Sequence, residues 1–190
     1  MNLTAMKRER VILGIDPGTN VMGFGVVKAT GAKVQVLHLD VLKLRTNMSQ
    51  TLKLKSIFDF CLSLTEQYLP DEMAVEAPFY GKNVQSMLKL GRAQGVIMAA
   101  ALHRNIPIEE YSPRKIKQSI TGNGNASKEQ VAVLLEKIFA QSLQGTYLDA
   151  TDGLAVALCH HYQSESSHLR NPQKAGSWSA YLRQNPEKRA

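Results

Sequence analysis

The sequence predicts an α/β domain built on a mixed five-stranded sheet flanked by helices, and two features of the chain predict it. The first is a series of three apolar runs, at residues 10–17, 20–29 and 33–43, which turn residues separate as in a meander of strands. The second is the alternation of helical and extended patterns in the rest of the chain. The 190 residues are enough for one well-buried domain and too few for two of ordinary size, so we expect a single core.

Two long helices are marked by the spacing of their apolar residues. Residues 49–69 carry apolar side chains at helical spacing until Pro70 ends the pattern, and the chain then returns to a strand that ends at Glu76. Residues 84–104 form a second helical pattern with small side chains in its later half, and we expect its alanines to pack against the sheet. The positions that define these helices are Leu52, Ile57, Phe60, Cys61 and Leu64 in the first, and Ala93, Gly95, Ala99, Ala100 and Ala101 in the second.

Two shorter helices are marked by their capping residues. After a fifth strand at residues 106–110, Ser112 supplies an N-cap and Pro113 occupies the first helical position. Ser127 and Gln130 have the spacing of a capping box, which opens the next helix. A final helical pattern closes the domain.

Four carboxylates occupy positions at one edge of the predicted sheet. Asp16 ends the first apolar strand and opens a turn, and Glu76 repeats this arrangement at the end of the fourth strand. Asp149 and Asp152 lie three residues apart at the head of the last helix, and this spacing puts both on one face. Two strand ends and one helical turn therefore contribute the acidic side chains.

An all-oxygen ligand set suits Mg²⁺, because hard cations prefer carboxylates and water. Two such ions about 3.5–4 Å apart clamp the attacking and leaving oxygens of a phosphoryl displacement. Each acid alone has a plainer explanation, since Asp16 begins a common Asp-Pro-Gly turn and Asp149 and Asp152 are favourable anions at a helix N-terminus. Taken together, the four predict a magnesium-dependent nuclease.

Four sequence blocks resemble a known family in order and spacing. The blocks are VILGIDPGTNVMGFGVV, VEAPFYGKNVQSMLKLGRAQGV, YSPRKIKQSITGNGNASKEQV and DATDGLAVALCHH. They resemble the RuvC family of crossover-junction endodeoxyribonucleases, the bacterial Holliday junction resolvases. The resemblance covers residues 10–163, and every catalytic carboxylate of the family has a counterpart here.

The resemblance implies a ribonuclease H-like fold and a specific activity. It implies that Asp16, Glu76, Asp149 and Asp152 are catalytic and bind two Mg²⁺ ions, for which Mn²⁺ is a substitute, and that the chain resolves four-way junction DNA by paired symmetric nicks during recombination and repair. It also implies a homodimer and cooperation with the branch-migration proteins RuvA and RuvB. The small-sided face of helix 84–104 is the candidate dimer surface.

Recognition of a four-armed polyanion is expected to depend on lysines and arginines that neutralise phosphates. Lys117 and Lys128 stand where the family keeps two lysines near the scissile region, and Phe79 matches its stacking aromatic. Stacking on an unpaired base is worth about 1–3 kcal/mol and tolerates any sequence. The full set of expected DNA contacts is Phe79, Tyr80, Lys82, Lys89, Arg92, Lys115, Lys117 and Lys128.

The overall composition is consistent with a DNA-binding protein. The chain has 23 Lys+Arg against 16 Asp+Glu, a formal charge of +7 that favours polyanionic partners. Cys61 and Cys159 lie far apart in apolar helical patterns and are expected to be buried thiols in a reducing compartment. No apolar stretch approaches the roughly 20 residues of a membrane span, and residues 1–14 lack the features of a signal peptide, so we expect a cytoplasmic protein.

The two ends of the chain are expected to lie outside the nuclease domain. Residues 1–9 form a basic leader, and residues 164–190 lack periodicity and are expected to be a basic, disordered tail. His160 and His161 are expected to cap the exposed end of the last helix.

Other classes share parts of this pattern. The turn Asp-Pro-Gly-Thr-Asn is also similar to the phosphate loop of the actin, Hsp70 and sugar-kinase ATPases, but those proteins need two domains of this size and a second phosphate loop. A relative that binds branched DNA without cutting it would require loss of a metal ligand, and none is lost. A resolvase of the smaller YqgF type is a further alternative, although the lysine block at residues 115–128 fits the RuvC family better.

Overall fold

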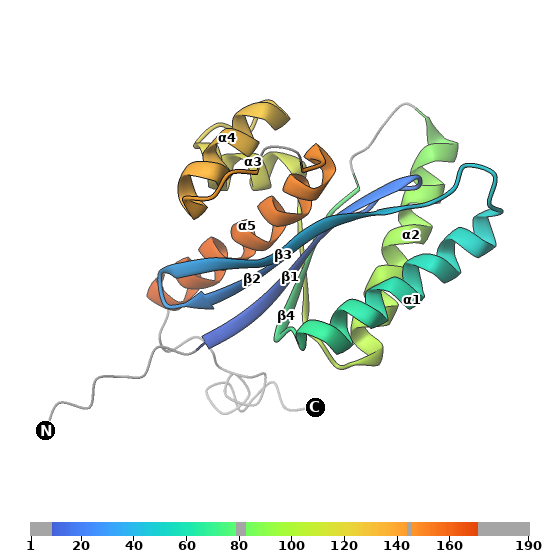
Figure 1. Ribbon diagram of the computed structural model, residues 1–190, viewed down its shortest axis with the longest axis horizontal. Helices are drawn as coiled ribbons and strands as arrows, with labels where there is room; N and C mark the ends of the chain where they lie inside the picture. The colour runs from blue at the N-terminus through green and yellow to red at the C-terminus, as the bar shows by residue number, and fades with distance from the viewer. Residues whose placement is uncertain (1–8, 79–82, 144–145, 171–190) are drawn as a thin grey trace, which may run out of the picture.

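The computed structural model describes residues 9–78, 83–143 and 146–170 (Figure 1). Along this part of the chain, strands and helices follow one another as β1 (Glu9–Asp16), β2 (Val21–Thr30), β3 (Lys33–Lys43), α1 (Gln50–Tyr68), β4 (Glu72–Glu76), α2 (Val84–His103), β5 (Ile108–Tyr111), α3 (Pro113–Thr121), α4 (Lys128–Phe139) and α5 (Leu148–Arg170). The expected leader to residue 8, the tail from residue 171, and Phe79, Tyr80 and Lys82 lie outside the described residues.

The five strands form one mixed sheet in the order β3-β2-β1-β4-β5. Strands β1, β2 and β3 pair in antiparallel fashion, whereas β4 is parallel to β1 and β5 is parallel to β4. The predicted α/β class with a mixed five-stranded sheet is therefore confirmed.

The helices cover both faces of this sheet (Figure 1). Helices α1 and α2 lie on one face, and α5 lies on the other with α3 and α4 beyond it (Figure 1). A single core was expected from the sequence, whereas the described residues form two, one on each face of the sheet, because the alternation of side chains along the strands sends apolar residues to both faces. Leu13 and Ile15 belong to the core beneath α1 and α2, whereas Ile12 belongs to the core beneath α5. Asp16, two residues beyond Gly14, consequently points to the α5 side.

Glycines let α5 approach the sheet until backbone meets backbone. A Cβ atom on Gly14 would lie 2.3 Å from the amide nitrogen of Ala157, and one on Gly23 would lie 1.7 Å from the carbonyl oxygen of Asp149. Gly153, on the helix itself, would place its Cβ 2.4 Å from the Cα of Phe24. In each of these contacts one residue is a glycine that meets backbone atoms of its partner, which lets the backbone of α5 lie directly on β1 and β2.

The helix caps expected from the sequence are present. The Ser112 side chain accepts a hydrogen bond from the Lys115 amide, with Pro113 in the first turn of α3. Ser127 and Gln130 form a reciprocal capping box at the start of α4. The two cysteines are buried thiols, as expected.

The sequence interpretation was wrong about the end of α5. His160 and His161 do not cap an exposed helix end, because α5 continues to Arg170 and both histidines are buried within it. Residues 164–170, expected to begin the disordered tail, are helical. The reason is tertiary: His160, Ser164 and Glu165 of α5 have partners on the sheet that are remote in sequence.

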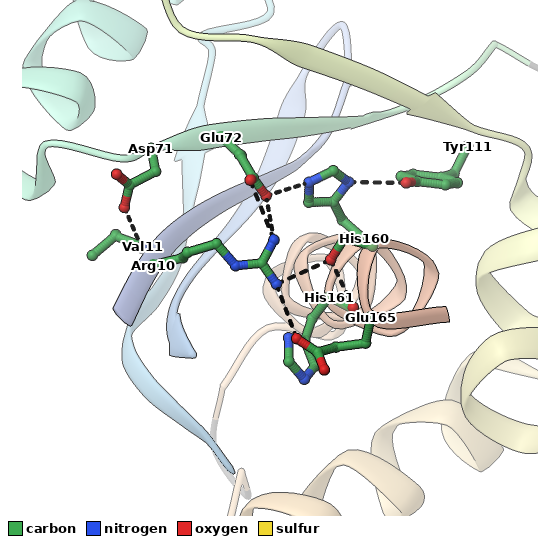
Figure 2. A network of polar contacts seen from close by, with 9 residues as sticks. Arg10, Val11, Asp71, Glu72, Tyr111, His160, His161 and Glu165 are labelled. Atoms are coloured by element: carbon green, nitrogen blue, oxygen red, sulfur yellow. Dashed lines mark hydrogen bonds and ion pairs between the residues drawn. The ribbon is translucent and has the colours of Figure 1, made fainter. Parts of the chain in front are cut away.

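These partners form a polar network (Figure 2). His160 Nε2 lies 2.8 Å from Glu72 Oε2 at the start of β4, and its Nδ1 lies 2.9 Å from the Tyr111 hydroxyl. Arg10 of β1 contacts the same Glu72 carboxylate at 3.1 Å and reaches Glu165 at 3.5 Å. Cations and anions are paired here, so the network fastens the C-terminal half of α5 to the sheet.

Candidate active site

Asp16 and Glu76 end two neighbouring parallel strands. Ile15 of β1 pairs with Val75 of β4, so the next residue on each strand is the carboxylate. Neighbouring strands lie about 4.8 Å apart, and residues at equivalent positions point to the same face. The two acids therefore leave the same edge of the sheet on the side that α5 covers.

The first turn of α5 brings Asp149 and Asp152 to this edge. Gly23 packs against the carbonyl of Asp149, which sets the helix start directly over β2. The Asp152 side chain is 15% exposed and the Asp149 side chain is 44% exposed. Asp152 consequently points inward and Asp149 lies nearer the surface.

Three of the four carboxylates line one cavity. This cavity of about 150 Å³ is bordered by Asp16, Glu76 and Asp152 together with Lys117 and Lys128. Apolar residues of α3, α4 and α5 complete its wall. Side chains from separate segments of the chain thus share a single small polar space.

The carboxylates that line this cavity outnumber the lysines beside them. The pKa of Asp16 rises to about 8, because of burial first and then because of repulsion by Glu76, Asp152 and Asp149. The pKa of Glu76 rises to about 7 through burial and repulsion by Asp152, against the attraction of Lys128 and Lys117. A cation placed among these carboxylates would offset the desolvation cost of their ionised forms and their mutual repulsion, and would thereby lower both pKa values.

Lys128 supplies part of the missing charge. Its Nζ lies 3.3 Å from Asp149 Oδ1 and also contacts Asp152 Oδ2. In this arrangement, no three or more His, Cys, Asp or Glu side chains of the described residues stand close enough together to hold a metal ion. The carboxylate oxygens fit a hard divalent cation chemically, and in this structure the ammonium group of Lys128 contacts two of the four carboxylates, those of Asp149 and Asp152.

The other expected DNA-binding residues have different positions. Lys117 borders the cavity, whereas Lys115 is exposed on α3 and is not among the residues that line it. Lys89 and Arg92 lie on the exposed side of α2, on the opposite face of the sheet. The expected contacts Phe79, Tyr80 and Lys82 fall in a segment that the structure does not describe.

One residue near the site was missed by sequence reasoning. Lys53 is buried at the start of α1 and contacts the turn that follows Asp16, whereas Leu52, which the sequence assigned to the apolar stripe, is 54% exposed. The spacing of four residues from Lys53 to Ile57 and from Ile57 to Cys61 is the signal that could have located it.

The fold is similar to that of a solved Holliday junction resolvase. The solved structure of Thermus thermophilus RuvC in complex with Holliday junction substrate superposes with a TM-score of 0.78 at 31% sequence identity, covering 83% of this chain and 96% of that one. The described chain thus has the fold of a junction-resolving nuclease.

The family follows from sequence comparison. The family model of crossover junction endodeoxyribonuclease RuvC matches residues 12–160. The crossover junction endodeoxyribonuclease RuvC of Christiangramia forsetii is 52% identical over 185 residues, covering 97% of this chain and 95% of its own length. That of Bacteroides fragilis is 51% identical over 183 residues, covering 95% of this chain and 96% of its own length. The chain belongs to the RuvC family of Holliday junction resolvases, nucleases of DNA recombination and repair.

No helix in the described part of the chain is both long enough and apolar enough to cross a membrane.

Proposed function

We propose that Asp16, Glu76, Asp149 and Asp152 bind two Mg²⁺ ions and that the chain uses them to hydrolyse one phosphodiester in each of two opposed strands of a four-way junction. When bound, the two ions activate the attacking water and stabilise charge on the leaving 3′ oxygen. The observation that carries the proposal is the shared cavity in which the pKa values of Asp16 and Glu76 are both raised. Mn²⁺ has the same preference for oxygen ligands and is expected to substitute.

In this proposal the carboxylates hold the metal ions, and the lysines neutralise the substrate phosphates. Asp16, the most buried member, would hold the ions together with Glu76 and the two acids of α5. Lys128 pairs with Asp149 and Asp152 in this structure, and it would contact a substrate phosphate when these carboxylates hold the ions. Lys117 faces the same cavity and is proposed as a second phosphate contact.

The wider DNA contacts are proposed from sequence, family and charge. The net charge of +7 favours a polyanion, and the Thermus thermophilus RuvC structure holds that protein in complex with a Holliday junction substrate. Phe79 and Tyr80 are proposed to stack on bases at the junction centre, and three lysines and one arginine are proposed to contact backbone phosphates. These are Lys82, Lys89, Arg92 and Lys115.

A homodimer would match the two-fold symmetry of the junction. Val84, Leu88 and Leu102 on α2 are 65%, 52% and 61% exposed. Cβ atoms on Gly91 and Gly95 would meet nothing within 4 Å. These five positions are spaced by three, four or seven residues, as in a helix–helix seam, and a second copy packed there would cover them. We infer that this exposed face of α2 is the dimer surface, in place of the alanine-rich face expected from the sequence, because Ala93, Ala100 and Ala101 are buried in the protein's own core. RuvA and RuvB are proposed as partners in the cytoplasm by family resemblance.

The proposal is tested with Asp16→Asn. This change removes a metal ligand and a negative charge but no phosphate contact, so cleavage of a synthetic four-way junction in Mg²⁺ is expected to fall by at least about 10³-fold, a typical loss for an essential group. Junction binding measured in Ca²⁺ is expected to remain. Asp59→Asn on exposed α1 is the matched control and should cut normally.

Two results would contradict the metal assignment. One is cleavage by Asp16→Asn at the rate of the Asp59→Asn control. The other is cleavage by the unsubstituted protein that continues at full rate after divalent ions have been removed with EDTA.

A further inference from the structure

Lys53 is a buried cation with no carboxylate partner among the described residues. The residue is 8% exposed, and its Nζ donates to the Thr19 carbonyl oxygen at 3.0 Å and to Asn20 Oδ1 at 2.7 Å. Both acceptors are neutral, and in the part of the chain that the structure describes no ion pair involves Lys53. Burying a charge without a counter-ion is unfavourable, so a role other than fold stability explains the choice of lysine.

The two acceptors belong to the turn that directly follows Asp16. The turn is tight, because a Cβ on Gly18 would lie 1.5 Å from the carbonyl oxygen of Val21. It is also fixed at its far end, where the amide of Leu44 donates to the Asn20 carbonyl at 2.8 Å. Lys53 supplies two further hydrogen bonds to the same dipeptide.

This turn controls where the Asp16 carboxylate lies. Asp16 is the last residue of β1 and pairs with Gly23 of β2, so β pairing restrains it on one side only. The chain after Asp16 continues into the turn to which Lys53 donates its two hydrogen bonds. Lys53 itself belongs to α1, on the sheet face opposite to α5, and the charges that shift the pKa of Asp16 are those of Glu76, Asp152, Lys128 and Asp149. Lys53 therefore acts on Asp16 through the backbone of the turn.

We propose that Lys53 is a positioning residue that fixes the turn at residues 17–20 from the opposite face of the sheet and thereby orients Asp16 for divalent-cation binding. The proposal rests on the metal site of the proposed function. The charge of Lys53 and its hydrogen bonds have opposite effects on Mn²⁺ affinity. Removing a nearby positive charge would by itself tighten Mn²⁺ binding, whereas losing the hydrogen bonds loosens the turn and weakens it.

The test replaces Lys53 by methionine, which keeps most of the apolar stem and removes the ammonium group. Mn²⁺ is titrated into the full chain without DNA, and free Mn²⁺ is followed by electron paramagnetic resonance. We expect Mn²⁺ affinity to fall by about tenfold, the effect of losing hydrogen bonds to a charged group. Junction binding in Ca²⁺ is expected to stay unchanged. The matched control is Lys55→Met, which removes the same charge from the exposed side of α1.

Two further measurements separate positioning from a general loss of structure. The Leu44 amide, which bonds to the turn, should exchange with solvent faster in Lys53→Met, while the midpoint of thermal unfolding should not fall. Asn20→Ala removes one acceptor and leaves Lys53 in place, so it serves if Lys53→Met does not fold. It should weaken Mn²⁺ binding less than Lys53→Met, and the double variant should bind like Lys53→Met alone.

Each outcome decides the question. Mn²⁺ affinity in Lys53→Met equal to that of Lys55→Met, or tighter, would overturn the positioning role, as would unchanged binding in Asn20→Ala should Lys53→Met not fold. If the unsubstituted protein itself binds no Mn²⁺, the proposed metal site fails, whatever the variants do.

Discussion

Substitution of Gly153 by alanine sets two opposing effects against each other, and the distances in the structure decide between them. Alanine is favoured over glycine in a helix interior by about 1 kcal/mol. Its Cβ, however, would lie 2.4 Å from the Phe24 Cα and 2.5 Å from the Phe24 nitrogen, well inside the 3.4 Å at which ordinary contact begins. Both atoms are backbone atoms of β2, so no flexible side chain can move aside.

The helix must therefore move away from the sheet by about 1 Å, or the strand must yield. Overpacking of this kind costs about 1–3 kcal/mol, and two backbones in contact place Gly153 at the upper end. Subtracting the gain in helix propensity leaves a net loss of about 1–2 kcal/mol in the free energy of unfolding.

Activity should fall further than stability. Asp152 precedes Gly153 and lines the cavity with Asp16, so displacement of α5 separates ligands of the proposed metal site. A misplacement of about 1 Å can cost about 100-fold in rate. Denaturant unfolding measures the first effect, and junction cleavage at saturating Mg²⁺ measures the second. A Gly153→Ala protein that is more stable than the unsubstituted chain and cuts at full rate would refute the reasoning.

Three further predictions concern other parts of the molecule. The pKa of Glu72 is lowered from 4.5 to about 2 by the hydrogen bond from His160 and by Arg10. Its contribution is thus present above pH 4.5 and lost as the pH falls toward 2. Glu72→Gln should remove about 1–2 kcal/mol of this acid-dependent stability, allowing for partial exposure, and acid titration of unfolding would show no change if the network were unimportant. Lys117→Ala should slow cleavage about tenfold or more with unchanged thermal unfolding, because the residue lines the cavity; a full-rate variant would make it a bystander. Leu88→Glu should give a monomer by sedimentation equilibrium, and a dimer that persists would exclude the α2 surface.

The sequence predicted the elements that local physics determines. Capping chemistry located the starts of α3 and α4, and strands that end in an acid located Asp16 and Glu76. The order and approximate bounds of all five strands were accessible, because apolar runs and turn residues recur at strand spacing. The approach of α5 to β1 was not, since it depends on glycines that meet only in the folded chain.

The errors concern side chains whose partners are remote in sequence. His160 looked like an exposed cap because polar residues follow it, yet Glu72 and Tyr111 satisfy both of its ring nitrogens. Lys53 was not singled out from the sequence, and its two acceptors lie more than thirty residues earlier. The helical spacing of Lys53 with Ile57 and Cys61 could have indicated its burial, but local sequence does not identify the remote groups to which Lys53 and His160 bond.

The two ends of the interface between α5 and the sheet differ in the balance between acidic and basic side chains. Arg10 and Asp16 stand six residues apart on β1, and Glu72 and Glu76 stand four apart on β4, so all four point to the same face. At the Arg10 end, anions meet cations supplied by the fold, and the pKa of Glu72 falls. At the Asp16 end, carboxylates outnumber lysines, and the pKa of Asp16 rises. The first end therefore stabilises the attachment of α5, and that attachment holds the carboxylates of the second end together against their mutual repulsion, at the place proposed for the divalent cations.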